Sequence, residues 1–509
     1  MADENLVPAF KMGYATVRAS GHYTMNCRPY NCALDKVGDP EVGWVAVHPA
    51  TIDSKEYLQF SFFRPQLVVG IATQGNPTMN QWVMTYKVFY HRNGGNDDRD
   101  WVPLKNSEEH QSFPGNSDVS TIVVQKLYQP VWASAVRVIP IECQGHTNMR
   151  CDVLIVRPGI FVLPAALPAI QPILSESFKM GYASVRSNTE HNPGHSAVNC
   201  YLHNTMSRVR AWVGKCCPAT LVTKEYVQFS FFQPQLVVAI ATQGRNNDTQ
   251  WVTKYYAFFH CQQGEEKEWK NISTERNGHE MQVFEGNTDS DTVKECKLLQ
   301  PVWATAVRVM PIQSATYTSM RCDVLINRLP PKNPPAIPPA IPDAQLVEAF
   351  KLGYAYIRSS GDRWEEKIDH YSENCYLDNT HNWAAVSKAW CGMNAAASVT
   401  TNEYLQFSFF KPQLVVAIAT QGRQDAAEWV TQYRVLYHYE GRAEANWGYA
   451  DSVLNGGNIF TGNSDQNTKV IRRLKNAVWA TAVRINPVGS SGYTSMRCDV
   501  LIRRPEAEH

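Results

Sequence analysis

The chain has 509 residues, of which 44% are hydrophobic, and its 48 basic residues are matched by 47 acidic ones. This composition is typical of a folded globular protein, and the balanced charge excludes a general attraction to nucleic acid or to an anionic membrane. No apolar run reaches the roughly 18 residues of a transmembrane helix, and the first residues lack the basic start and apolar core of a secretory signal.

In chain order, the first repeated element is the segment Phe10 to Arg18, for which the sequence predicts a short strand. It returns from Phe178 and from Phe350 with few changes. Each copy is followed by a polar loop whose sequence differs between copies. Loops that vary between repeated strands are the usual place for binding residues.

A 20-residue block follows, reading EYLQFSFFRPQLVVGIATQG from Glu56, and it recurs from Glu225 and Glu403. Leu58, Phe60 and Phe62 alternate with polar residues, as in a half-buried strand. Pro65 should end that strand, because proline gives no N–H to a ladder, and residues 67 to 72 should form a second, fully covered strand.

The block starts lie 169 residues (225 minus 56) and 178 residues (403 minus 225) apart, enough for an independent core in each copy. Further short strands, each bounded by turn residues, follow every block. The sequence therefore predicts an all-β protein of three antiparallel sandwiches. The predicted boundaries are 1–158 for domain 1, 159–172 for a linker with prolines, 173–328 for domain 2, 329–342 for a proline-rich linker, 343–505 for domain 3 and 506–509 for a tail. The second linker should favour stiff polyproline II, which would hold the domains apart.

Only two of the cysteine positions recur in every copy. They are Cys32 and Cys151, Cys200 and Cys322, and Cys375 and Cys498. Each pair could form a disulfide within its domain, or each cysteine could be a small buried apolar residue. The chain has no CxxC pairs, so a zinc site is not expected.

Other recurring polar residues favour structural roles. His91, His260 and His438 recur without a nearby nucleophile on a glycine-rich elbow, so a catalytic role is not expected. Asp118, Asp289 and Asp465 lie in Gly-Asn-x-Asp turns and should cap them, although a role in binding Ca²⁺ stays open. Arg137 with Arg150 and Asp152, and their counterparts, should form salt bridges within the sandwich.

The order of motifs resembles the discoidin family, also called the coagulation factor V/VIII type C domain. In the first copy these motifs are GYATVR, an Asn-Cys dipeptide, Trp44, YLQF, IATQG, a Gly-Asn-x-Asp turn and MRCD. The resemblance covers nearly all of each copy and implies a jelly-roll β-sandwich whose ligands bind loops at one end. It also implies a family of binding modules rather than enzymes.

Under this resemblance, the loop after the opening strand and the loop after each repeated block are the ligand-binding loops. Sugar recognition needs an aromatic face and planar polar groups, and these loops hold both. The predicted ligand-binding residues are His22, Tyr23, Asn76 and Met79 in copy one, His191, His195, Arg245, Asn247 and Asp248 in copy two, and Arg363, Trp364, Arg423 and Asp425 in copy three.

The resulting hypothesis is a non-enzymatic, multivalent lectin-like protein in cell adhesion or aggregation, with cell-surface or matrix glycans as partners. The alternative is a matrix or membrane-surface protein that binds phospholipid or protein through the same loops. The resemblance implies an extracellular or cell-surface location, and the missing secretory signal leaves cytoplasmic storage with non-classical release as the alternative. No nucleic-acid partner is expected, and self-association into a homo-oligomer stays open.

Overall fold

A computed structural model of the chain describes most residues outside the linkers and the tips of several loops. The described residues are 6–24, 27–34, 36, 42–53, 55–92, 101–108, 110–157, 173–205, 210–216, 218–220, 222–261, 269–272, 282–328, 334–365, 368–379, 387–439, 447–454 and 457–505. Within these ranges no helix has the length and apolarity needed to cross a membrane.

Domain 1 consists almost entirely of strands. Its elements are β1 (Leu6–Pro8), α1 (Ala9–Met12), β2 (Ala15–Ala19), η2 (Pro29–Cys32), β3 (Trp44–Val45), β4 (Leu58–Gln74), β5 (Trp82–His91), β6 (Val102–Pro103), β7 (Ser112–Pro114), β8 (Val123–Gln144) and β9 (Asn148–Val156).

Domains 2 and 3 repeat this order. Domain 2 contains β10 (Ile173–Glu176), β11 (Ala183–Ser187), η4 (Pro193–His195), η5 (Ala197–Asn199), β12 (Trp212–Val213), β13 (Val227–Gln243), β14 (Val252–His260), β15 (Lys270–Asn271), β16 (Phe284–Glu285), β17 (Lys294–Ser314) and β18 (Ser319–Arg328). Domain 3 contains η7 (Asp343–Gln345), β19 (Leu346–Glu348), β20 (Ala355–Ser359), β21 (Trp364–Glu365), β22 (Ile368–Asp369), η8 (Ser372–Cys375), β23 (Trp390–Cys391), β24 (Leu405–Gln421), β25 (Trp429–His438), β26 (Gly448–Tyr449), β27 (Ile459–Thr461), β28 (Val470–Ser491) and β29 (Ser495–Arg503).

The strands of each domain share one antiparallel topology. In domain 1 the order is β1-β9-β4-β8-β5-β6, with β2 beside β4, β3 beside β9 and β7 beside β5, and the other two domains repeat it. Alternate residues of β4 face a core that includes Phe60, Ile71 and the fully buried Trp44. The predicted all-β fold with three tandem sandwiches is therefore confirmed.

Two local predictions were wrong. The repeated block forms one strand, β4, that continues through Pro65, because the pairing of β4 with β8 shifts register between Ser61 and Gln66 and leaves the proline outside the regular ladder. The segment from Phe10 begins with the one-turn helix α1, and Gly13 ends it at φ +84° before β2 starts.

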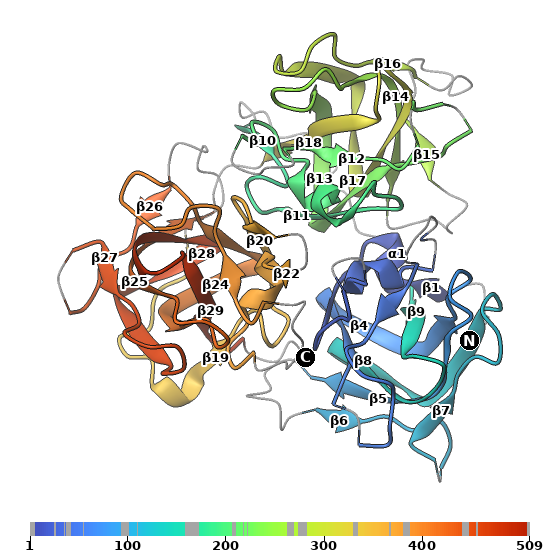
Figure 1. The fold of residues 1–509 in the computed structure, drawn as a ribbon, viewed down its shortest axis with the longest axis horizontal. Coiled ribbons are helices and arrows are strands. Elements are labelled where there is room, and N and C mark those ends of the chain that lie inside the picture. Colours follow the sequence, from blue (N-terminus) through green and yellow to red (C-terminus); the bar gives the residue numbers. More distant parts are fainter. Residues whose placement is uncertain are drawn as a thin grey trace.

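The domains are not held apart. They pack into a closed ring in which each domain touches both others, so the prediction of separated sandwiches was wrong (Figure 1). Phe63, Phe232 and Phe410, one from each repeated block, meet with all three ring centroids 5.0 Å apart and edge-to-face angles near 60°. These mutual contacts place a pseudo-threefold axis through the three phenylalanines.

The same polar contact closes each of the three interfaces. Arg186 of domain 2 donates to the carbonyl of Lys11 in domain 1, Arg358 of domain 3 donates to Lys179 in domain 2, and Arg18 of domain 1 donates to Lys351 in domain 3. The distances are 3.0, 3.0 and 2.9 Å. Charged hydrogen bonds of this kind are among the stronger ones in proteins.

A glycine beside each accepting carbonyl makes this approach feasible. Gly181 has φ +85°, and a Cβ placed on it would lie 2.6 Å from the Ser408 Oγ of domain 3. Gly13 and Gly353 face Ser230 and Ser61 in the same way. The glycine of the repeated FKMGY and FKLGY segments is thus required both by its backbone angle and by the closeness of the next domain.

We expect Gly181→Ala to destabilise the protein by on the order of 2–4 kcal/mol, because the left-handed backbone and the contact with Ser408 both become unfavourable. Chemical denaturation measures this loss. Adding Ser408→Ala should recover part of it, since the nearest clashing atom is removed. Gly457→Ala is the control, because a Cβ at Gly457 would have no atom within 4 Å. Equal stability of Gly181→Ala and the control would contradict this account of the interface.

Candidate functional site

Buried side chains hold three loops together at one end of each sandwich. The indole of Trp44 donates to the Gly21 carbonyl in the loop after β2, and Glu56 accepts the backbone N–H groups of Val47 and His48 in the loop after β3. In domains 2 and 3 the indoles of Trp212 and Trp390 donate the corresponding bonds. Glu225 and Glu403 likewise accept backbone N–H groups. The first residue of the repeated block therefore positions a neighbouring loop.

The third loop is the turn after each repeated block, and a buried arginine holds it through hydrogen bonds to its carbonyl groups. Arg150 donates to the carbonyls of Gly75 and Val119, and Arg321 and Arg497 do the same at the corresponding turns. The predicted salt bridge between Arg150 and Asp152 is absent, because Asp152 instead accepts the N–H groups of Phe10 and Lys11.

Five side chains converge on this loop end in every domain, and together they form the candidate site. Site 1 consists of Tyr23, Asn76, Gln81, His146 and Asn148. Site 2 consists of His191, Arg245, Gln250, Tyr317 and Ser319. Site 3 consists of Arg363, Arg423, Glu428, Tyr493 and Ser495.

Backbone bonds give the three sites a common frame. The first residue of each site donates its N–H to the residue after the buried tryptophan: Tyr23 to Val45, His191 to Val213 and Arg363 to Cys391, at 2.8–2.9 Å. The second residue donates its N–H to the carbonyl of the third across the turn, at 2.9 Å in all three domains.

Side-chain contacts complete the frame. The first residue contacts the fourth. The Tyr23 and His146 rings are tilted with centroids 5.2 Å apart, the His191 and Tyr317 rings meet edge to face at 6.2 Å, and the Arg363 guanidinium lies 3.7 Å from the centre of the Tyr493 ring. The third residue accepts a hydrogen bond from the fifth at 3.3, 2.8 and 2.8 Å in sites 1, 2 and 3. Three different sets of side chains therefore adopt one geometry.

Site 1 carries no charged side chain, and its loop tips are apolar. Met79 and Tyr23 are exposed. Asn76 is buried and its side chain accepts from the N–H groups of Thr78 and Met79, so it caps the turn. His22 is also buried, beneath the loop surface. Burial lowers the pKa of His146.

Two further side chains adjoin site 2: His195, which contacts His191, and Asp248, which pairs with Arg245. Arg245 lies 3.3 Å from Asp248, and the exposed Asn247 forms the turn between them with φ +55°. The His191 and His195 rings meet edge to face at 5.5 Å. Burial, together with Arg245 and His191, lowers the pKa of His195 to about 3, so its imidazole is neutral at pH 7.

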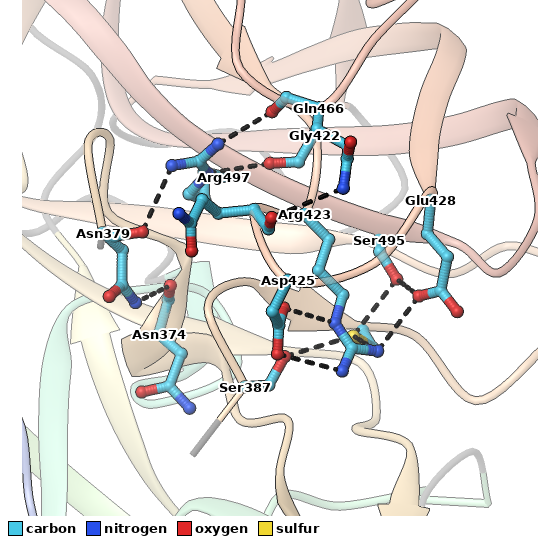
Figure 2. Close-up of polar contacts among 12 residues, drawn as sticks. Asn374, Asn379, Ser387, Gly422, Arg423, Asp425, Glu428, Gln466, Ser495 and Arg497 are labelled. Carbon is cyan, nitrogen blue, oxygen red and sulfur yellow. Dashed lines mark hydrogen bonds and ion pairs between the residues drawn. The ribbon is translucent and has the colours of Figure 1, made fainter. Parts of the chain in front are cut away.

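Site 3 is a network of charges (Figure 2). The Arg423 guanidinium bonds to Asp425 at 2.8 and 3.3 Å and to Glu428 at 3.1 Å, and Arg363 lies 3.7 Å from Glu428. The Cys391 sulfur lies 3.9 Å from the Arg423 guanidinium and 3.1 Å from the Ser495 hydroxyl oxygen. Trp364 belongs to β21, and its side chain lies outside what the structure describes.

Of the five residues that converge in each site, the sequence predictions include the first and second and omit the other three. The fourth and fifth residues lie in the hairpins before the repeated MRCDVLI strands, where the sequences HTN, YTS and YTS precede a constant motif. The third residue directly precedes a recurring tryptophan. At each of these three positions one copy differs from the other two, and this difference beside constant motifs was the available indication.

The six recurring cysteines are free thiols, so the disulfide candidates Cys32 with Cys151, Cys200 with Cys322 and Cys375 with Cys498 are not formed. All six are buried. The Cys200 and Cys375 thiols instead donate to the carbonyls of Cys322 and Cys498, at 3.6 and 3.8 Å. The structure therefore agrees with the alternative prediction, in which each recurring cysteine is a small buried residue.

The other recurring polar residues have structural contacts. His91, His260 and His438 are buried, and each lies against a tryptophan ring at 5.3–5.5 Å. Asp118 accepts the N–H groups of Thr121 and Ser120, and these bonds lower its pKa to about 2, so it caps its turn as predicted. Among the described residues, no group of three or more histidine, cysteine, aspartate or glutamate side chains could hold a metal ion.

Comparison with known proteins finds one family model. The F5/8 type C domain matches residues 16–153, 183–324 and 359–500. The chain is 31% identical to a discoidin-1 chain of Dictyostelium discoideum over 154 residues, 30% of this chain and 56% of that protein. It is 23% identical to neuropilin-1 of Xenopus laevis over 315 residues, 61% of this chain and 32% of that protein. The chain thus spans less than two thirds of the length of these relatives.

Among solved structures, recombinant discoidin II of Dictyostelium discoideum is similar. Its sequence identity is 13% and its TM-score is 0.28, with 65% of this chain and all of that chain covered.

We expect the Cys391 thiol of site 3 to resist alkylation in the folded protein. Burial raises its pKa to about 11, so only roughly one thiol in a thousand is ionised at pH 8. Iodoacetamide at pH 8 followed by peptide mass spectrometry should find Cys391 unmodified and the partly exposed Cys143 modified. In guanidinium chloride both should react. Rapid modification of Cys391 in the folded chain would contradict the buried position.

Proposed function

The chain belongs to the F5/8 type C domain family, and we propose that it is a non-enzymatic, multivalent glycan-binding protein acting in cell adhesion or aggregation. The observation that carries this proposal is the frame that sites 1, 2 and 3 share. In each, an exposed or partly exposed ring lies beside planar or hydroxyl groups already oriented by hydrogen bonds. This is the combination that saccharide rings and their hydroxyls require.

Charge balance supports uncharged glycans as the ligands. Site 1 has no charged side chain, Arg245 of site 2 faces Asp248, and the two arginines of site 3 face Glu428 and Asp425. A cation that is paired within the site gives little net attraction to a phosphate or sulfate group. Neutral hydroxyls can still bond to both members of each pair.

The ring supports multivalency. Rotation about the pseudo-threefold axis carries each site to the next, so the three sites lie at equivalent positions around the ring. Sites held at fixed spacing in one molecule can engage a multivalent target together, which raises overall affinity by roughly 10²–10⁴ where the geometry allows it. Because the side chains differ, the three sites need not prefer the same glycan.

One observation favours a second candidate, binding to a phospholipid surface. The loop after β3, which begins beside site 1, exposes Ile52, and the corresponding loops expose Val222 and Val399. Met79 adds a further exposed apolar side chain at site 1. Exposed aliphatic tips are what insertion into a membrane interface needs.

We expect the fourth residue of each site to be required for glycan binding. His146→Ala, Tyr317→Ala and Tyr493→Ala each remove a ring that contacts the first residue of its site, and each should weaken its own site about tenfold. The triple variant should lose binding on a glycan array. Tyr449→Ala, which removes an exposed tyrosine of β26 away from the sites, is the matched control. Absence of glycan binding by the unmodified chain, or full binding by the triple variant, would refute the proposal.

A liposome experiment separates the second candidate. If the aliphatic tips insert into lipid, the chain should sediment with phosphatidylserine vesicles, and the Ile52→Asp/Val222→Asp/Val399→Asp variant should remain in solution. The glycan proposal expects both proteins to remain in solution and both to bind glycans equally.

A further inference from the structure

In domain 3 a proline-rich segment of the chain itself covers an apolar patch on the outer face of the sandwich. Ile341 is buried there against Leu414 and Val416, with Ala477 and Trp479 beside it. Arg473 donates to the Ile341 carbonyl at 2.8 Å and pairs with Asp343 two residues later. The segment thus docks through one aliphatic anchor, one backbone carbonyl and one carboxylate.

Domain 1 has the same patch, here called the domain 1 platform: Leu67, Val69, Pro130 and Trp132. Register establishes the correspondence, because Trp132 pairs with Leu67 in β8 and β4 as Trp479 pairs with Leu414 in β28 and β24. Lys126, opposite Gly70, occupies the position of Arg473, opposite Ala417.

The two patches differ in how much of them is covered. Trp132 is 63% exposed, whereas Trp479 is partly buried beneath the docked segment. Tyr128, 48% exposed, lies four residues earlier in β8. An indole exposed to this extent, two residues after an exposed proline on the same strand, is typical of binding surfaces rather than of a plain sheet face.

The docked segment in domain 3 shows which chemistry fits such a patch. Residues 334–342 read PPAIPPAIP, and prolines hold an extended chain in the polyproline II form at little entropic cost. Rows of tryptophan and tyrosine side chains are the usual receptors for segments of this kind.

We propose that the domain 1 platform binds a proline-rich extended segment of a partner protein, with an aliphatic residue seated on Trp132. This activity is separate from sites 1 to 3, because it uses the outer face of β4 and β8 rather than the loops. The protein would then join a ligand-bound surface to a second protein.

A labelled peptide with the sequence of residues 334–345, PPAIPPAIPDAQ, tests the proposal on the full chain by fluorescence anisotropy. We expect saturable binding at one site, and at least tenfold weaker binding to Trp132→Ala. Because Trp132 is mostly exposed, this variant should keep its circular dichroism spectrum. Tyr449→Ala and a peptide with serine at both isoleucine positions are the controls for protein and probe.

A second variant tests the correspondence between domains. Ile341→Asp should release the chain's own segment from domain 3 and raise the peptide stoichiometry from one to two. Three outcomes would overturn the proposal: no saturable binding, binding that Trp132→Ala leaves unchanged, or concentration-dependent self-association in analytical ultracentrifugation that Trp132→Ala abolishes. The last would make a second copy of this chain the occupant.

Discussion

The contact on which this structure depends is the close approach of one backbone turn to the next domain. A glycine in the left-handed region lets the turn approach, and an arginine from the neighbour then bonds to the carbonyl two residues earlier. Each arginine also bonds to a glutamine within its own domain, so the contact between domains continues into the sheet. Because this contact occurs at all three interfaces, the ring closes without a different kind of interface between the first and last domains.

The chain separates residues that build the frame from residues that line the candidate sites. Trp44, Glu56, Arg150 and their counterparts are repeated and hold the loops, whereas each of the five site positions changes in at least one domain and the first differs in all three. The repeated block therefore carries packing, and its glutamate also orients a loop. Substitution at the exposed positions leaves these supports intact, which explains how three chemically different sites keep one geometry.

Much of the fold could be predicted from the sequence, because alternation of apolar residues, turn motifs and near-identical repeats are local properties. The position of the first two residues of each site was also predictable, because they lie in variable loops beside constant strands. The packing of the domains into a ring was not predictable for two reasons. The proline content of the linkers indicated only that they are stiff. Phe63 and its counterparts fitted equally well as core residues of separate domains. The hairpin residues such as Tyr493 were missed because they reach the site from a distant part of the chain. The cysteine spacing allowed disulfides, and only the geometry showed carbonyls as the thiol partners.

The closed ring within a single chain has a further consequence. A trimer assembled from separate chains can be symmetric, whereas here the three sites are all different and follow one another in a fixed rotational order. Such a ring has a handedness when viewed along its pseudo-threefold axis. A target whose three ligands are arranged in the mirror-image order would satisfy at most part of the ring, so the covalent order of the domains itself encodes a spatial pattern.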